Sequence, residues 1–120
     1  MKKRILVVDD DNMNLVRTKM ILGQEYEVLL AESGKEALEK LKVEKVDMVL
    51  LDIDMPEMNG IETFERMKDF AAETPVIFLT ASGLEEDVVN AIRLGAANYL
   101  KKPFRPQELI KRVAQEFAKQ

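Results

Sequence analysis

The sequence ILVVDDD, residues 5–11, joins four consecutive branched aliphatic residues to three aspartates. A strand with apolar side chains on both faces is typical of a parallel sheet that is covered by helices on each side. The run MVLLD, residues 48–52, has the same form and also ends on an aspartate. We therefore predict two buried parallel strands, each with carboxylates at its carboxyl end.

Apolar runs alternate with segments of helical period along the chain, which is the pattern of successive βα units. The predicted strands are 4–9, 28–31, 48–51, 76–79 and 98–100. The predicted helices begin at Asn12 as N-cap, at Ser33 or Gly34, after Gly60, at about Leu84 and at about Pro106. The first should end at Leu22 before Gly23, and the fourth at Gly95. Residues predicted to face the core include Val88, Ala91 and Ile92 in the fourth helix and Leu109, Ile110, Val113 and Phe117 in the last.

The number of βα units limits the architecture. Five units within 120 residues predict an open, doubly wound α/β sheet, because a βα barrel needs roughly twice that length. We expect one domain over residues 1–120, with strand 28–31 toward an edge because its flanks are more polar. In such sheets the ligand site lies beyond the carboxyl ends of the strands.

Composition excludes several kinds of site. With 18 basic and 22 acidic residues the net charge is -4, so there is no basic field for direct nucleic-acid binding. The chain has neither cysteine nor histidine, so a metal must bind to oxygen ligands. We expect no signal peptide, because only a run of four apolar residues precedes the first aspartates, and no apolar run reaches membrane-spanning length. We expect a cytoplasmic protein that does not bind membranes.

The predicted strand ends bring polar residues to one edge of the sheet. Asp9 and Asp10 follow the first strand, Asp52 the third, Thr80 the fourth and Lys102 the fifth. If the first and third strands are neighbours, as in the order 2-1-3-4-5, three carboxylates share one crevice. Their repulsion is relieved by a divalent cation, for which Mg²⁺ fits best, with Mn²⁺ as an alternative.

This set of residues suits phosphoryl chemistry. A carboxylate beside Mg²⁺ can act as a nucleophile toward phosphorus and form an acyl phosphate. Positioning and charge neutralisation dominate such transfers. We therefore predict that the Lys102 ammonium and the Thr80 hydroxyl bind oxygens of the phosphoryl group.

Four segments, ILVVDDD, LLDIDMPEMNG, PVIFLTA and LGAANYLKKPF, resemble those of the response regulator receiver domain in their order and spacing. This family is the aspartate-phosphorylated module of two-component signalling and includes the chemotaxis regulators. The resemblance implies a flavodoxin-like (βα)5 fold, with Asp52 as the phosphoacceptor. It implies a sensor histidine kinase or a histidine phosphotransfer protein as the donor. Because the chain contains no histidine, we expect the phosphoryl group to come from such a protein or from a small acyl phosphate.

The resemblance also implies a set of metal ligands. Mg²⁺ would be held by Asp10, Asp52 and the backbone carbonyl of Asp54, with Asp9 acting largely through water. Asp54, which looks equivalent to Asp52 in the sequence, would then supply a carbonyl rather than a nucleophile.

Further residues receive switching roles from the resemblance. Thr80 and Tyr99 would be the switch pair, Ala81 the small residue that gives access to the phosphate, and Lys102 the phosphoryl-binding lysine ahead of a cis bond to Pro103. Asp54 and Ser82 lie where the phosphoryl lifetime is tuned. The sequence departs from the family at Asn59 and Asn98, where many relatives have aspartate.

The resemblance places the output surface on the fourth helix, fifth strand and fifth helix, toward a downstream protein or output domain. Candidate contacts are Glu86, Asn90, Arg93, Tyr99, Gln107, Lys111 and Arg112. A plain solvated face explains these polar residues equally well.

Three other functions fit parts of the pattern. The pair Asp52 and Asp54 matches the DxD motif of haloacid dehalogenase-like phosphatases, in which the second aspartate is the general acid, but those enzymes carry it on their first strand. Flavodoxin-like cofactor binding would need a phosphate-binding loop after the first strand, and the sequence has none there. A phosphorylation-independent interaction module would not need the five site residues. We expect a signalling domain rather than an enzyme.

Overall fold

The computed structural model describes residues 1–81 and 85–120, and side chains outside 82–88. The strands are β1 Arg4–Val8, β2 Glu27–Ala31, β3 Met48–Asp52, β4 Val76–Thr80 and β5 Asn98–Lys101. The helices are α1 Asn12–Leu22, α2 Gly34–Val43, α3 Gly60–Ala71, α4 Glu85–Arg93 and α5 Pro106–Ala118. Within the part of the chain that is described, no helix is long and apolar enough to cross a membrane.

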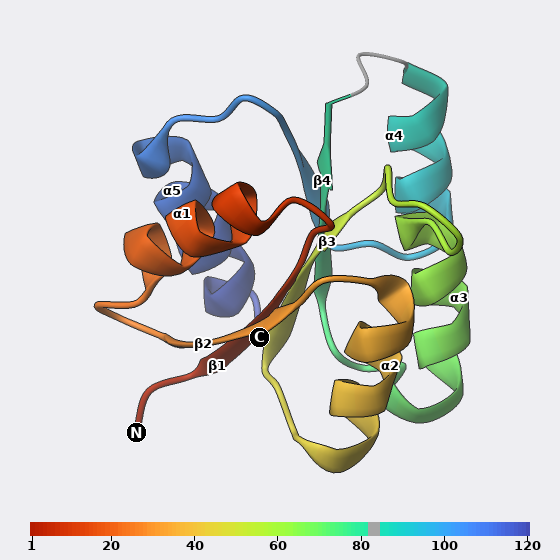
Figure 1. Cartoon of the computed structure of the whole chain (residues 1–120). Coiled ribbons are helices and arrows are strands. Elements are labelled where there is room, and N and C mark those ends of the chain that lie inside the picture. Colours follow the sequence, from red (N-terminus) through yellow and green to blue (C-terminus); the bar gives the residue numbers. More distant parts are fainter. Residues whose placement is uncertain (82–84) are drawn as a thin grey trace.

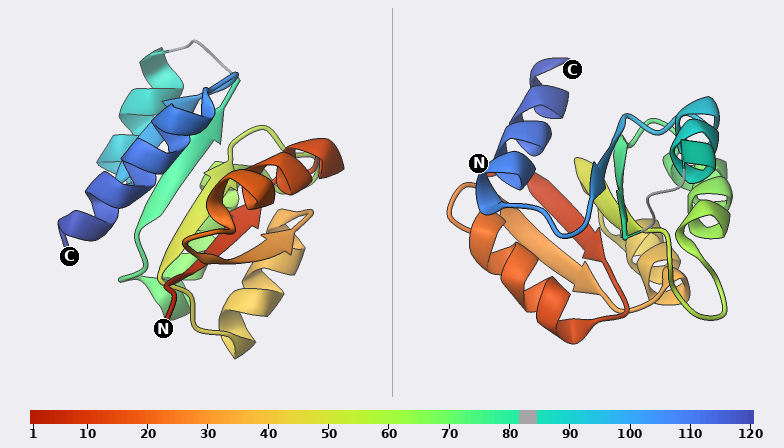
Figure 2. Two further views of the ribbon diagram at one scale, coloured as in Figure 1. Left: turned by 90° about the vertical axis from the view of Figure 1, so that its left-hand side faces the viewer. Right: turned by 90° about the horizontal axis from the view of Figure 1, so that it is seen from above.

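All strand pairs are parallel, and they form one sheet in the order β2-β1-β3-β4-β5. Helices α1 and α5 cover one face, and α2, α3 and α4 cover the other (Figure 1). The two further views in Figure 2 show the same layers. The predicted doubly wound architecture and strand order are confirmed, and β2 lies at an edge as its polar flanks predict.

Each face of the sheet has its own hydrophobic core, because alternate strand residues point to opposite sides. The α2–α4 core includes Leu6, Val8, Leu51 and Phe78 from the strands and Ala37, Phe64, Met67 and Ala91 from the helices. The α1–α5 core includes Ile5, Val7, Leu50 and Leu79 with Leu15, Leu22, Leu109 and Val113. Since β3 is buried on both sides, its carboxyl end is held between two packed layers.

The start of α1 differs from the prediction by one residue. The N-cap is Asp11 rather than Asn12, because Asp11 has the extended backbone of a cap and its Oδ1 accepts the Met13 N–H at 2.9 Å. Aspartate and asparagine are both good caps, so residue preference alone does not distinguish the two positions. At α3, Asn59 and Glu62 form a reciprocal capping box.

Two residues that were predicted to be buried are exposed. Ile92 is 47% exposed and Ile110 is 40% exposed. Each follows a fully buried residue, Ala91 and Leu109 respectively, and successive helix residues point in directions about 100° apart. The predicted helix faces were therefore too wide. Leu84, the predicted start of the fourth helix, lies outside the described backbone. The side chain of Val88, a predicted core residue, lies outside the described side chains.

Gly60 makes a close backbone contact with the end of β3. Its N–H donates to the Ile53 carbonyl at 2.9 Å. A Cβ atom at this position would overlap the Asp52 carbonyl oxygen and lie 2.8 Å from Ile53 Cα. Glycine is therefore required here by close backbone approach, and it fixes α3 against the strand that carries Asp52.

We expect Gly60→Ala to lower the free energy of unfolding by about 1–3 kcal/mol, because the added methyl group displaces backbone that cannot rotate away. Urea unfolding followed by circular dichroism measures the change. The control is Glu65→Ala at an exposed position of the same helix, which should stay within about 0.5 kcal/mol of the wild type. Equal stability of the two variants would contradict the steric role of Gly60.

Candidate functional site

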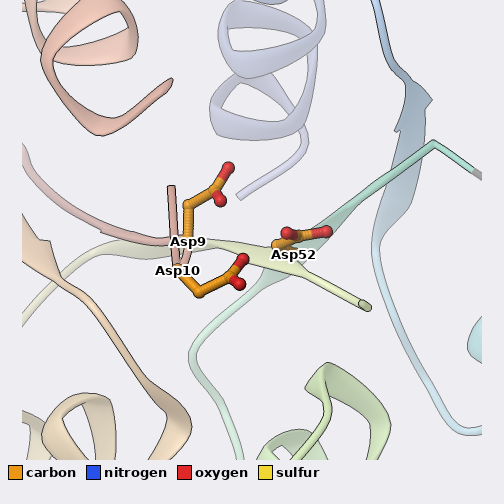
Figure 3. Close-up of side chains that lie close together, drawn as sticks. All are labelled: Asp9, Asp10 and Asp52. Carbon is orange, nitrogen blue, oxygen red and sulfur yellow. The ribbon is translucent and has the colours of Figure 1, made fainter. Parts of the chain in front are cut away.

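Three carboxylates meet where the carboxyl ends of β1 and β3 lie side by side (Figure 3). Asp9 and Asp10 follow β1, and Asp52 is the last residue of β3. One carboxylate oxygen from each residue lies within 4.8 Å of the others. Asp9 and Asp52 are only 2% and 5% exposed, whereas Asp10 lies at the surface. The acidic cluster that the sequence predicts is therefore present.

The side chain of Lys102 enters this crevice from the segment after β5. Its Nζ lies 2.6 Å from Asp9 Oδ2 and 3.4 Å from Asp52 Oδ2. The Lys102 backbone N–H donates to the Thr80 carbonyl at 2.7 Å, and the bond between Lys102 and Pro103 is cis. One ammonium thus contacts two of the three carboxylates.

The alternation of side chains explains why these groups meet. Asp52 comes two residues after Leu50, and Lys102 comes two residues after Leu100. Both leucines belong to the α1–α5 core. Side chains two residues apart on a strand lie on the same face, so the carboxylate and the ammonium leave the sheet on one side.

Burial has opposite effects on the two partners. It is the main cause that raises the pKa of Asp52 to about 6, opposed by the positive charge of Lys102 and reinforced by the negative charge of Asp9. For Lys102, burial lowers the pKa, but the hydrogen bond to Asp9 and the charges of Asp52 and Asp9 outweigh it, so the pKa is raised. Negative charge in the crevice exceeds what one ammonium balances.

The donor set of the cluster fits a hard divalent cation. The three side chains offer only carboxylate oxygens, which suit Mg²⁺ or Mn²⁺ and leave positions for water and a phosphate oxygen. A bound dication would also stabilise the ionised form of the buried Asp52 carboxylate. Asp9, Asp10 and Asp52 are therefore the residues that could hold a metal.

The structure separates Asp54 from Asp52. The Asp54 side chain is exposed, and its backbone N–H donates to Asp52 Oδ1 at 3.3 Å. The two aspartates of the DxD sequence therefore have different environments, one buried and one solvated. Ser82, the second predicted lifetime residue, lies outside the described residues.

The remaining predicted residues surround the crevice. Thr80 ends β4 and is 1% exposed. Ala81 lines a cavity of about 220 Å³ together with Asp9 and Lys102. Tyr99 is half-buried in β5 and packs against the α2–α4 core. Their positions suit the switching roles, which stay predictions.

Two residues that support the site, Asp11 and Arg17, were not predicted from the sequence. The Asp11 N–H donates to Asp9 Oδ1 at 2.9 Å, so the cap residue of α1 also orients a site carboxylate. Arg17 donates to the Phe104 carbonyl at 3.1 Å and stacks on the Phe104 ring, which anchors the segment after Lys102. The Asp11 contact follows from its place at a strand–helix junction, but the Arg17 contact joins residues 87 apart and has no local sequence pattern.

The comparison with protein families agrees with this geometry. A family model described as the response regulator receiver domain matches residues 5–114. The chain belongs to this family. The resemblance that the sequence motifs indicate is thus confirmed, and receiver domains are signalling domains.

Named relatives and solved structures support the same assignment. The transcriptional regulatory protein CrdR of Helicobacter pylori is 45% identical over 98% of this chain and 56% of its own length. A receiver domain protein from Methanospirillum hungatei described as CheY-like has a TM-score of 0.93 at 33% identity, with coverage of 99% and 96% of the two chains. The BeF3-activated receiver domain of DrrB, a Thermotoga maritima protein, gives 0.90 at 33% identity, with coverage of 98% and 99%. The chain spans about half the length of the curated relatives it matches.

The raised pKa of Asp52 predicts a pH-dependent effect of Asp52→Asn. Asp52 has a pKa of about 6 in the folded protein against 3.8 when unperturbed, so between these values the folded state holds the extra proton and stability falls as pH rises. In EDTA at pH 7.5 we expect the variant to be more stable than the wild type by up to about 3 kcal/mol, with the difference vanishing toward pH 4. Thermal or urea unfolding across this pH range checks it.

The matched control is Asp54→Asn, which removes the same charge from an exposed position two residues away. It should change stability little at any of these pH values. A stability difference for Asp52→Asn that does not vary with pH would contradict the buried-charge explanation.

Proposed function

We propose that this chain accepts a phosphoryl group on Asp52 in a Mg²⁺-dependent reaction and passes the change to its α4, β5 and α5 surface. The observation that carries the proposal is the environment of Asp52. Its buried carboxylate lies 3.4 Å from the Lys102 ammonium and beside the carboxylates of Asp9 and Asp10. This combination supplies a nucleophile, a cation for the phosphoryl oxygens and an oxygen-ligand metal site.

The proposed reaction is transfer from a phosphohistidine to Asp52. A carboxylate oxygen of Asp52 attacks phosphorus, the phosphorus–nitrogen bond of the donor breaks, and the imidazole leaves and takes up a proton. The bound cation would neutralise charge on the transferred group. Lys102 would turn from the carboxylates toward a phosphoryl oxygen, and the Thr80 hydroxyl would donate to another.

The partners follow from this chemistry. The donor is a sensor histidine kinase or a histidine phosphotransfer protein, and we place the protein in the cytoplasm with such a donor. The matched relative CrdR is named a transcriptional regulatory protein and extends well beyond the matched region, which supports an output domain or a separate protein as the recipient of the signal. Direct contact of this chain with nucleic acid or a membrane is not part of the proposal.

The elements proposed as the output surface carry apolar as well as polar side chains. Val89, Ile92 and Ile110 are 45%, 47% and 40% exposed. Of the predicted polar contacts, Asn90, Arg93, Gln107 and Lys111 are exposed, Arg112 is half-buried, and the side chain of Glu86 lies outside the described residues. This mixture of apolar and polar side chains is compatible with a protein–protein interface, and it is equally compatible with a plain solvated face.

The geometry favours a receiver over a DxD phosphatase. The phosphatase mechanism needs the Asp54 carboxyl group as a general acid at the leaving group. Instead the Asp54 side chain is exposed, and it is the backbone N–H of this residue that contacts Asp52. The pair also lies on β3 rather than on the first strand.

Incubation with acetyl phosphate and Mg²⁺ tests the proposal. We expect intact mass spectrometry to detect one added phosphoryl group, which is lost with EDTA or in Asp52→Asn, because both the nucleophile and the cation are needed. Lys102→Met should reduce the labelled fraction, since the phosphoryl oxygens lose their ammonium partner.

The control variant is Asp54→Asn, which should still be labelled. Labelling that survives in Asp52→Asn and moves to Asp54 would exclude Asp52 as the acceptor. Steady turnover of an unrelated phosphomonoester such as p-nitrophenyl phosphate would instead support the phosphatase.

A further inference from the structure

β5 is an edge strand, and its free edge is covered by side chains at Tyr99. The Lys102 N–H donates to Thr80 in β4, and in a parallel strand the residues that bond to the neighbour alternate with those that do not. The backbone N–H and carbonyl of Tyr99 therefore point away from β4. An edge of this kind leaves backbone polar groups that need other partners.

A polar network from α5 supplies those partners. Arg112 Nη1 donates to the Tyr99 carbonyl at 2.6 Å and to Asn98 Oδ1 at 3.0 Å. Asn98 Oδ1 also accepts the Tyr99 N–H at 2.8 Å, and Asn98 Nδ2 donates to Glu116 Oε2 at 2.9 Å. The Arg112 guanidinium carbon lies 5.9 Å from the centre of the Tyr99 ring. Asn98, Arg112 and Glu116 together are here called the edge clamp.

The Glu116 carboxylate explains why residue 98 is an amide. Glu116 is 4% exposed, and its Oε2 accepts from Asn98 and from the Lys119 ammonium at 3.2 Å. An aspartate at position 98 would place a second carboxylate at hydrogen-bond distance from this buried one. An amide can donate to Glu116 and accept from Arg112 at the same time, which an ionised carboxylate cannot do.

We propose that the edge clamp is a positioning device that holds β5 and Tyr99 in the arrangement in which Lys102 pairs with Asp9 and Asp52. This inference rests on the proposed function for its consequence, because Lys102 lies three residues after Tyr99 on the same short segment. Phosphorylation of Asp52 would pull Lys102 toward the phosphoryl group. Any resulting shift of β5 would have to stretch or rebuild the bonds from Arg112, so that α5 responds to the state of Asp52.

Two of the bonds join a guanidinium to neutral oxygens, which makes them stronger than neutral hydrogen bonds. Loss of one such bond shifts a two-state equilibrium by roughly tenfold. Removing Arg112 should therefore favour the shifted arrangement of β5. The substitution acts through Asn98 and Tyr99, which are the residues that Arg112 binds.

The chain carries its own reporter for Tyr99. It has no tryptophan and only two tyrosines, so Tyr26→Phe leaves Tyr99 as the one strong fluorophore. In this background we expect Arg112→Met to raise the acrylamide quenching constant of Tyr99 roughly twofold, because the strand edge opens locally. Lys35→Met, which removes the same charge from an exposed position of α2, should leave quenching unchanged.

The second measurement follows phosphorylation by acetyl phosphate and Mg²⁺ in the same variants. We expect Arg112→Met to be labelled faster by up to roughly tenfold and to lose most of the change in Tyr99 fluorescence that labelling produces in the parent. Asn98→Asp should behave similarly, because its carboxylate repels Glu116. The double variant Asn98→Asp/Glu116→Gln restores one donor and one acceptor, and it should return both readouts toward the parent values. Rescue of both readouts would show that the contact between residues 98 and 116 sets them, rather than either substitution alone.

The outcomes separate the two proposals. If Arg112→Met behaves like Lys35→Met in both measurements, or if the double variant is not rescued, the edge clamp is wrong even when Asp52 is phosphorylated normally. If the parent itself is not phosphorylated, the proposed function fails, while the quenching measurement still decides whether the clamp holds Tyr99. Unfolding midpoints of all variants identify any variant whose fold is lost, and the double variant then decides the result.

Discussion

The ammonium of Lys102 lies between two buried carboxylates, and the arrangement of the sheet depends on this contact. It joins residues 93 positions apart in sequence, and it links the first strand to the segment after the last. Without it, Asp9 and Asp52 would be two buried like charges with no positively charged partner among the side chains that the structure describes. The contact forms only if β1, β3 and β5 end at the same level of the sheet, so the register of the strands and the geometry of the site are one constraint.

The same contact leaves an imbalance that gives the site its chemistry. Three carboxylates face one ammonium, and burial raises the pKa of Asp52. Such a crevice favours whatever brings positive charge, namely a proton or a divalent cation. Strain of this kind is tolerated because the strand beneath it is buried on both faces. The fold thus tolerates an unfavourable cluster of carboxylates at one edge of the sheet.

The central strands and the acidic cluster could be predicted from the sequence, because the apolar runs and the polar residues that follow them indicate the same parallel sheet. The apolar runs at residues 5–8 and 48–51 define the central strands, and the polar residues that follow them define the site edge. Asp9, Asp10, Asp52 and Lys102 come together as the parallel arrangement predicts, since the strand ends of a parallel sheet share one edge. Each predicted strand differs from the observed one by at most one residue at either end.

The features that could not be predicted from the sequence depend on side-chain contacts between elements that are distant along the chain. Ile92 and Ile110 are apolar residues at helical spacing, yet their neighbours already fill the inner face, and only packing reveals how wide that face is. Arg17 and Arg112 look like ordinary surface cations until the carbonyls that they bind are known. Asp11 and Asn12 are equally good caps, so the choice between them is made by the strand that delivers the chain to α1.

The segment between Asp52 and α3 has a consequence of a different kind. The Gly60 N–H donates to the Ile53 carbonyl at 2.9 Å, so this hydrogen bond closes the loop of residues 53–60 at its base. The side chains of Asp54 and Glu57 in this loop are exposed to solvent. Because both side chains are exposed, they contribute little to the stability of the fold. Natural variation or engineering can therefore exchange these two residues with little effect on the fold, so the solvent-facing chemistry next to Asp52 can change while the strand that carries Asp52 stays the same.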